Sequence, residues 1–61
     1  MIKVLYKDNT KHIVTFDNDV EALEFCEKNQ NKKDIIYAFK YFGFDLDFHT
    51  WDDIYRFLKE N

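Results

Sequence analysis

Asp45, Asp47 and His49 occupy alternate positions in the run FDLDFH and could in principle bind a metal ion. Side chains two residues apart on a strand point to the same face, and carboxylate and imidazole groups are ligands for divalent cations. The run lacks the central glycine and the terminal glutamate of an EF-hand loop. We therefore keep a metal site as an alternative, expect a solvated strand face, and expect no cofactor.

The last third of the chain carries the whole net charge. The protein has 12 acidic and 9 basic residues, a formal charge of −3, and its first forty residues hold seven lysines and seven acids. An acidic surface in the last third is a candidate partner-binding site, and its carboxylates could imitate the phosphates of a nucleic acid. The four aspartates of this candidate surface are Asp45, Asp47, Asp52 and Asp53.

Groups that could carry out nucleophilic catalysis are scarce. The chain contains no serine, and its only cysteine, Cys26, falls on the apolar stripe of a predicted helix, where a thiol behaves as a small hydrophobic group. The two histidines, His12 and His49, lie far apart in the sequence. A ligand pocket needs about 300 Å³ or more, which so short a chain rarely encloses. We expect that the protein is not an enzyme.

Lys3, Lys7 and Lys11 suggest a second alternative, a strip that contacts nucleic acid. The three lysines fall on one face of a predicted hairpin. The aromatic side chains that would stack on bases alternate onto the other face, and the total charge is negative. Lysines on an exposed sheet face also protect against edge-to-edge aggregation. Direct nucleic-acid binding is therefore disfavoured.

Residues 1–16 are predicted to form a β-hairpin, because two β-prone runs flank the turn signal KDNTK. A two-residue loop would mix apolar and basic side chains on both faces. A three-residue loop pairs Lys7 with Lys11. It places most apolar side chains on one face and the basic side chains on the other, which favours this register. The apolar face then carries Ile2, Val4, Tyr6, His12, Val14 and Phe16, and the other face carries Lys3, Leu5, Lys7, Lys11, Ile13 and Thr15.

Two helices are predicted, each with a capping signal. Residues 18–30 begin with Asn18 followed by Glu21, and the terminal helix begins with Thr50 followed by Asp53, the spacing of a capping box. Acidic residues in the first turn and basic residues near the end of each helix suit the helix dipole. The apolar stripe of the terminal helix contains Trp51, Ile54, Tyr55 and Leu58.

Residues 34–42 are apolar on all sides and suit either a strand or a helix; two isoleucines and four aromatic residues favour a strand. Regular alternation would place Tyr37, Phe39 and Tyr41 together, and these are the predicted aromatic partner-binding residues. A sheet covered on one side needs only one apolar face, so apolar side chains on the second face indicate an interaction surface. Ile36 and Phe42, together with Leu5 and Ile13, are the other candidates. Gly43 marks a bulge or bend.

The expected fold is α+β and forms one domain over residues 1–61, in the order β-β-α-β-(β)-α. It contains a mostly antiparallel sheet of three strands, with residues 44–49 as a candidate fourth, and both helices cover one face. No apolar run approaches the roughly 20 residues of a membrane span, and the lone thiol is typical of a cytoplasmic protein.

We expect a small protein-protein interaction module, such as a phage or mobile-element inhibitor or adaptor of a host protein. Its partner would be another protein, for example a nucleic-acid-binding host protein blocked by the acidic surface. Homodimerisation is a further expectation, because it commonly stabilises small domains.

Overall fold

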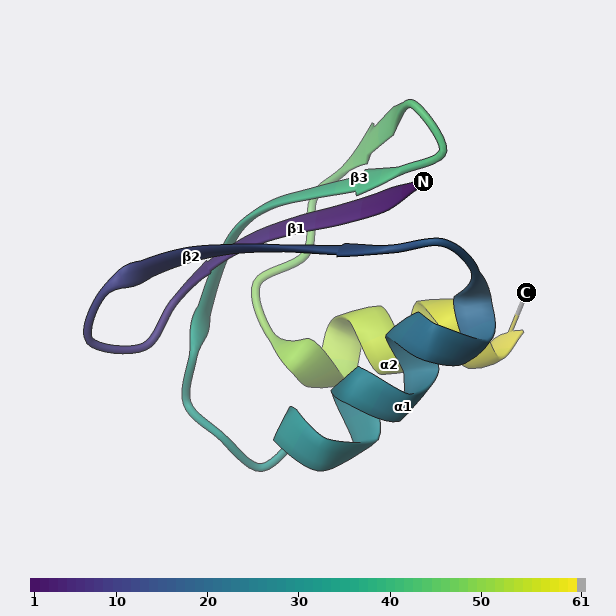
Figure 1. Ribbon diagram of the computed structural model, residues 1–61. Helices are drawn as coiled ribbons and strands as arrows, with labels where there is room; N and C mark the ends of the chain where they lie inside the picture. The colour runs from purple at the N-terminus through teal and green to yellow at the C-terminus, as the bar shows by residue number, and fades with distance from the viewer. Residues whose placement is uncertain (61) are drawn as a thin grey trace.

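Six elements follow one another in the computed structural model, which describes residues 1–60 (Figure 1). The predicted α+β class is confirmed, and the candidate fourth strand is present, although it is short. The elements are β1 (Ile2–Lys7), β2 (Lys11–Phe16), α1 (Asp19–Asn29), β3 (Ile35–Tyr41), β4 (Phe44–Leu46) and α2 (Trp51–Glu60).

The four strands form one sheet in the order β2-β1-β3-β4, and every neighbouring pair is antiparallel. β1 is therefore a central strand, with β2 and β4 at the two edges. α1 connects β2 to β3, which run parallel to each other on either side of β1. Both helices lie on the same side of the sheet, below it in Figure 1. One sheet face is covered, and the other, called the outer face below, is left open.

The first hairpin has the predicted register, because Lys7 pairs with Lys11 across a three-residue loop. Asp8 stabilises this loop. Its Oδ1 accepts a hydrogen bond from the Thr10 backbone N–H at 3.0 Å and lies 3.0 Å from His12 Nε2. The backbone hydrogen bond from Thr10, and then the side-chain hydrogen bond with His12, lower the pKa of Asp8 to about 2.

Both predicted capping boxes are present. Asn18 Oδ1 accepts the Glu21 N–H at 3.0 Å, and the Glu21 carboxylate accepts the Asp17 N–H at 2.9 Å. At the start of α2, Thr50 Oγ1 accepts the Asp53 N–H at 3.1 Å, and Asp53 Oδ2 accepts the Thr50 N–H at 3.3 Å. These bonds satisfy N–H groups that have no partner inside the helix, which defines where each helix begins.

A single core lies between the sheet and the two helices. Trp51 is its largest fully buried side chain, and its ring packs against Tyr6 and Phe25 with centroid distances of 5.0 and 5.1 Å. The indole N–H donates to Asp34 Oδ2 at 2.9 Å, so the one polar atom of the ring is satisfied. The other buried apolar residues are Ile2, Val4, Phe16, Ala22, Cys26, Ile36, Phe39, Ile54 and Leu58.

A two-residue turn joins β3 to β4, because Tyr41 pairs with Phe44. Phe42 and Gly43 both have positive φ, at 47° and 89°. This is the signature of a type I′ turn, whose twist matches that of the flanking strands. Glycine suits this conformation, whereas phenylalanine is strained in it. The bend predicted at Gly43 is therefore confirmed, and Phe42, one of the candidate surface residues, is exposed at its tip.

We expect Phe42→Asn to be more stable than Phe42→Ala by about 1 kcal/mol. Both variants lose the phenyl ring, but asparagine tolerates the left-handed conformation better than alanine. Urea denaturation of the two variants measures the difference. Equal midpoints would show that the turn does not hold this conformation in solution.

Candidate functional site

β3 contains a β-bulge that changes which of its side chains face the helices. Leu5 of β1 pairs with Ala38, but the next residue, Tyr6, pairs with Ile36, so Tyr37 is the extra residue. Ile36 and Phe39 are consequently both buried, at 3% and 1% exposure, although they are three positions apart and regular alternation would place them on opposite faces. Tyr37 and Ala38, in contrast, both lie at the surface.

The prediction that Tyr37, Phe39 and Tyr41 share one exposed face is wrong. Phe39 lies in the core, with its ring 5.5 Å from that of Phe48 and 6.0 Å from that of Phe57. Tyr41 also faces the helices, and its hydroxyl lies 3.0 Å from both carboxylate oxygens of Asp19. Of the three aromatic candidates, only Tyr37 is exposed, at 49%. The bulge is the physical reason.

The other aromatic and aliphatic candidates also divide into buried core residues and exposed residues. Ile36 belongs to the core, whereas Phe42 is exposed at the β3–β4 turn. Phe44 is also exposed. It pairs with Tyr41 near the end of the sheet, where the short edge strand β4 begins. Leu46, two residues on, packs partly against the core.

The outer face presents an apolar row that runs across three strands. Leu5 pairs with Ile13 on one side and with Ala38 on the other. Ile13 is 61% exposed, and Leu5 at the centre of the row is partly buried by its neighbours. A hollow on this face is lined by Lys3, Leu5, Ile13, Ala38, Lys40 and Asp45.

A row of lysines lies on each side of the apolar row. Lys3 pairs with Lys40, and Lys40 with Asp45, whose carboxylate lies 3.8 Å from the Lys40 ammonium group. On the other side Lys7 pairs with Lys11.

The Lys11 ammonium group lies 5.8 Å from the centre of the Tyr37 ring, a cation–π contact across the outer face. The sequence correctly placed Lys3, Lys7 and Lys11 on one face. It missed that Tyr37 and Lys40 join them there, because only the bulge and the β3 pairing reveal it.

The four candidate aspartates have different local surroundings. Asp45 pairs with Lys40, and Asp52 lies 3.0 Å from the Arg56 guanidinium group one helical turn on. Asp53 caps α2, as described above. Asp47 is the most exposed of the four, with 94% of its side chain accessible. Asp45, Asp52 and Asp53 therefore have partners within the chain and lie on two different elements, β4 and α2, and the Asp47 carboxylate lies 3.9 Å from the His49 ring.

Asp45, Asp47 and His49 do not converge. β4 ends at Leu46, and Asp45 turns to Lys40, while Asp47 Oδ1 lies 3.9 Å from His49 Nε2. Within residues 1–60, no group of three or more acidic, histidine or cysteine side chains is arranged to hold a metal ion.

The candidate catalytic groups are likewise separate. Cys26 is buried, and burial raises the pKa of its thiol to about 12, so the nucleophilic thiolate does not form near neutral pH. His12 is held by Asp8 and stacks on Tyr6 in the first hairpin. His49 lies beyond β4, and its carbonyl accepts the Ile36 N–H at 3.1 Å.

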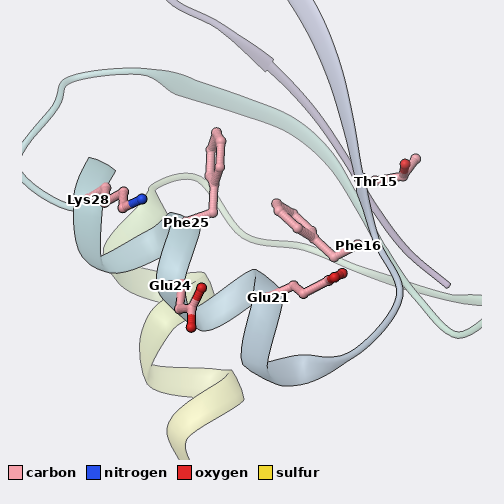
Figure 2. A pocket seen from close by; sticks show the side chains of 6 residues that line it. All are labelled: Thr15, Phe16, Glu21, Glu24, Phe25 and Lys28. Carbon is pink, nitrogen blue, oxygen red and sulfur yellow. The ribbon is translucent and has the colours of Figure 1, made fainter.

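A second hollow lies between the edge strand β2 and α1 (Figure 2). Phe16 and Phe25 form its apolar base, with ring centroids 5.4 Å apart. Glu21 is already bonded to the Asp17 N–H, and Glu24 points away from the two rings in Figure 2. The lining residues are Thr15, Phe16, Glu21, Glu24, Phe25 and Lys28. They include no nucleophile paired with a base.

Compared with known proteins, the chain matches no family model, no curated protein and no solved structure. Neither of the helices within residues 1–60 has the length and apolar character needed to cross a bilayer. We therefore infer its function from the geometry of the chain itself.

We expect Phe39→Ala to lower the free energy of unfolding by about 3–5 kcal/mol, and Tyr37→Ala by less than about 1 kcal/mol. The first leaves a cavity in the core, whereas the second removes an exposed ring. Urea denaturation followed by circular dichroism measures both. Similar losses for the two variants would show that Tyr37 and Phe39 share one face, so that β3 alternates regularly and has no bulge at Tyr37.

We expect the stability advantage of the wild type over Cys26→Ala to shrink as the pH rises. The Cys26 thiol has a pKa of about 12 in the folded protein, whereas a thiol in the unfolded chain has a pKa near 8.5. The contribution of the buried thiol to the free energy of unfolding is therefore complete below about pH 8.5 and is progressively lost above it. The slope is at most about 1.4 kcal/mol per pH unit. Urea denaturation of both proteins at pH 8, 9 and 10 tests this, and a constant difference would contradict a buried neutral thiol.

Proposed function

We propose that this protein is a non-enzymatic module that binds another protein through the outer face of its sheet. One observation carries the proposal: the apolar row of Ile13, Leu5 and Ala38 crosses three strands of a face that neither helix covers. A sheet packed on one side is usually polar on the other, so an apolar row there is a candidate contact surface.

The surface is also rigid. Leu5 lies on β1, which is paired along its length with β2 and β3. The opposite side of β1 is anchored by Ile2 and Val4, both fully buried. A partner that docks here loses little affinity to the ordering of the surface, because the surface is already formed. Tyr37 at the border of the row is a residue type that commonly anchors interfaces.

The candidate catalytic groups support the non-enzymatic part of the proposal. Cys26 is held as a neutral buried thiol. His12 lies on β2, whereas His49 lies in the loop between β4 and α2. His12 is engaged by Asp8. Thr10 Oγ1 lies 3.0 Å from His12 Nε2, but Asp8 Oδ1 lies 3.0 Å from the same ring nitrogen. In a catalytic constellation the carboxylate orients the base through its other ring nitrogen, so these three side chains form a turn contact instead. The single unbridged thiol suits a reducing compartment, and we place the module in the cytoplasm.

Direct nucleic-acid binding is a second candidate, favoured by one observation. The bulge brings Tyr37 onto the same face as Lys3, Lys7 and Lys11, where the sequence predicted no aromatic residue. Binding of single strands depends on several stacking platforms, and the centre of this face is aliphatic instead. A protein partner therefore suits the outer face better.

An acidic inhibitor that imitates phosphates is the alternative version of a protein-binding module. Its support is weaker, because Asp45, Asp52 and Asp53 are engaged by Lys40, Arg56 and the start of α2. A host protein remains the proposed kind of partner, and a phage or mobile element the proposed source, but the surface we favour is the outer face.

We expect Ile13→Asp to reduce partner capture at least tenfold, because it places a charge in the apolar row. Val20→Asp is the matched control, since Val20 is equally exposed, at 64%, but lies on α1. Each protein is immobilised and exposed to nuclease-treated extract of the source organism, and captured proteins are quantified by mass spectrometry. Capture that both variants retain, or that only Val20→Asp removes, would contradict the proposal.

A further inference from the structure

We infer that the segment recognised by the outer face is an amphipathic helix of another protein with acidic residues along both flanks. This inference rests on the proposed function and adds the chemistry of the partner. It is carried by the arrangement of the lysines, which form two rows with the apolar row between them.

The spacing of the two rows fits a helix. Lys3 and Lys7 are four residues apart on β1, which separates their Cα atoms by about 13 Å. A helix with its side chains is about 10–12 Å across. A helix that lies on Leu5 and Ile13 therefore places its two flanks above the two lysine rows. Lysine side chains can also contribute their apolar stems to such a contact while their ammonium groups reach the carboxylates.

The charge distribution selects an acidic partner. The lysines of the outer face are Lys3, Lys7, Lys11 and Lys40, and they outnumber its two acids, Asp45, which is paired with Lys40, and Asp47, which lies beside Tyr37 and Ala38 at the β4 edge. The rest of the chain carries the opposite sign, with ten acidic residues and five basic ones. A partner with acidic flanks is thus attracted to the outer face and repelled by the other surfaces.

A second copy of this chain does not fit the outer face. Two outer faces brought together would oppose two sets of four lysines, which is unfavourable. The helices of a second copy are acidic, but their apolar stripes, which include Cys26, Ile54 and Leu58, are buried in their own core. Val20 on α1 is exposed, but one side chain cannot cover the row, so the helix must come from a different protein.

The two parts of the surface have different roles. Exposed ion pairs contribute little each, about 0.2–1 kcal/mol, and are screened by salt. Burial of apolar groups from the partner against Leu5, Ile13 and Ala38 therefore supplies much of the affinity. The lysines fix the orientation of the helix and increase the rate of association.

A peptide-display selection tests the inference without knowledge of the natural partner. A library of random 16-residue peptides is selected against the immobilised wild-type protein. We expect enriched peptides with Leu, Ile, Met or Phe at helical spacing and with Asp or Glu on both flanks. A synthesised peptide of this kind should gain helical circular dichroism on binding and should lose affinity as salt rises from 50 to 500 mM.

Charge-reversal variants then locate the contact. Lys3→Glu combined with Lys7→Glu alters one lysine in each row and should weaken peptide binding at least tenfold. Lys32→Glu combined with Lys33→Glu is the matched control, because it changes the charge equally in the α1–β3 loop, and should leave binding within about twofold. Circular dichroism verifies folding, and Lys3→Gln with Lys7→Gln replaces the first pair if that pair does not fold.

The outcomes separate the inference from the proposed function. Enriched peptides that bind the outer face, as shown by loss with Ile13→Asp, but carry no acidic flanks or no helix would overturn the inference alone. Enriched peptides that are insensitive to Ile13→Asp would overturn both. Both would also be overturned if no peptide is enriched and the protein binds a 12-nucleotide oligo(dT) in a way that Tyr37→Ala abolishes. If no peptide is enriched and oligo(dT) does not bind either, the inference alone is overturned.

Discussion

One extra residue in β3 determines which side chains reach the helices and which remain at the surface. The bulge at Tyr37 lets Ile36 and Phe39 both enter the core, although regular alternation would have sent them to opposite faces. Without it, the sheet would have to bury either the hydroxyl of Tyr37 or the ammonium group of Lys40. Both alternatives would place a polar group in the core without an evident partner. The same bulge brings Tyr37 and Ala38 onto the outer face, so the core and the candidate binding surface depend on a single irregularity.

The small core makes this placement important. A domain of this size buries only about 60% of the surface that its unfolded chain exposes, so each large buried ring contributes a substantial share of its stability. Phe39 contacts the rings of Phe48 and Phe57 on the α2 side, and Trp51 connects β1 with α1 through Tyr6 and Phe25. These contacts anchor the inner side of β1 and β3. The outer face can therefore carry an exposed apolar row without being needed for folding.

Much of the fold could be predicted because its signals are local. The hairpin register follows from the parity of apolar and basic residues, and the helix starts follow from Asn18 with Glu21 and Thr50 with Asp53. The bulge could not be predicted, since it depends on how β3 meets Leu5 and Tyr6 of a strand distant in sequence. Of the three aromatic candidates only Tyr37 is exposed, because the bulge separates it from Phe39 and Tyr41. The lysine strip, which lies within one hairpin, was placed on one face correctly. Lys40 was the available sign that Phe39 and Tyr41 face the core, because its ammonium group requires the opposite, exposed face.

The lysines of the outer face explain how an exposed apolar row can be tolerated. An uncovered sheet with Ile13 and Leu5 at its centre would be prone to stack on another copy, and charged residues beside such rows are a common protection. Lys3, Lys7 and Lys11 provide that protection, because stacked copies would bring like charges together. The same repulsion is removed when the approaching surface is acidic. Protection against self-association and preference for an acidic partner are therefore two consequences of one charge pattern, and a substitution that weakens one should weaken the other.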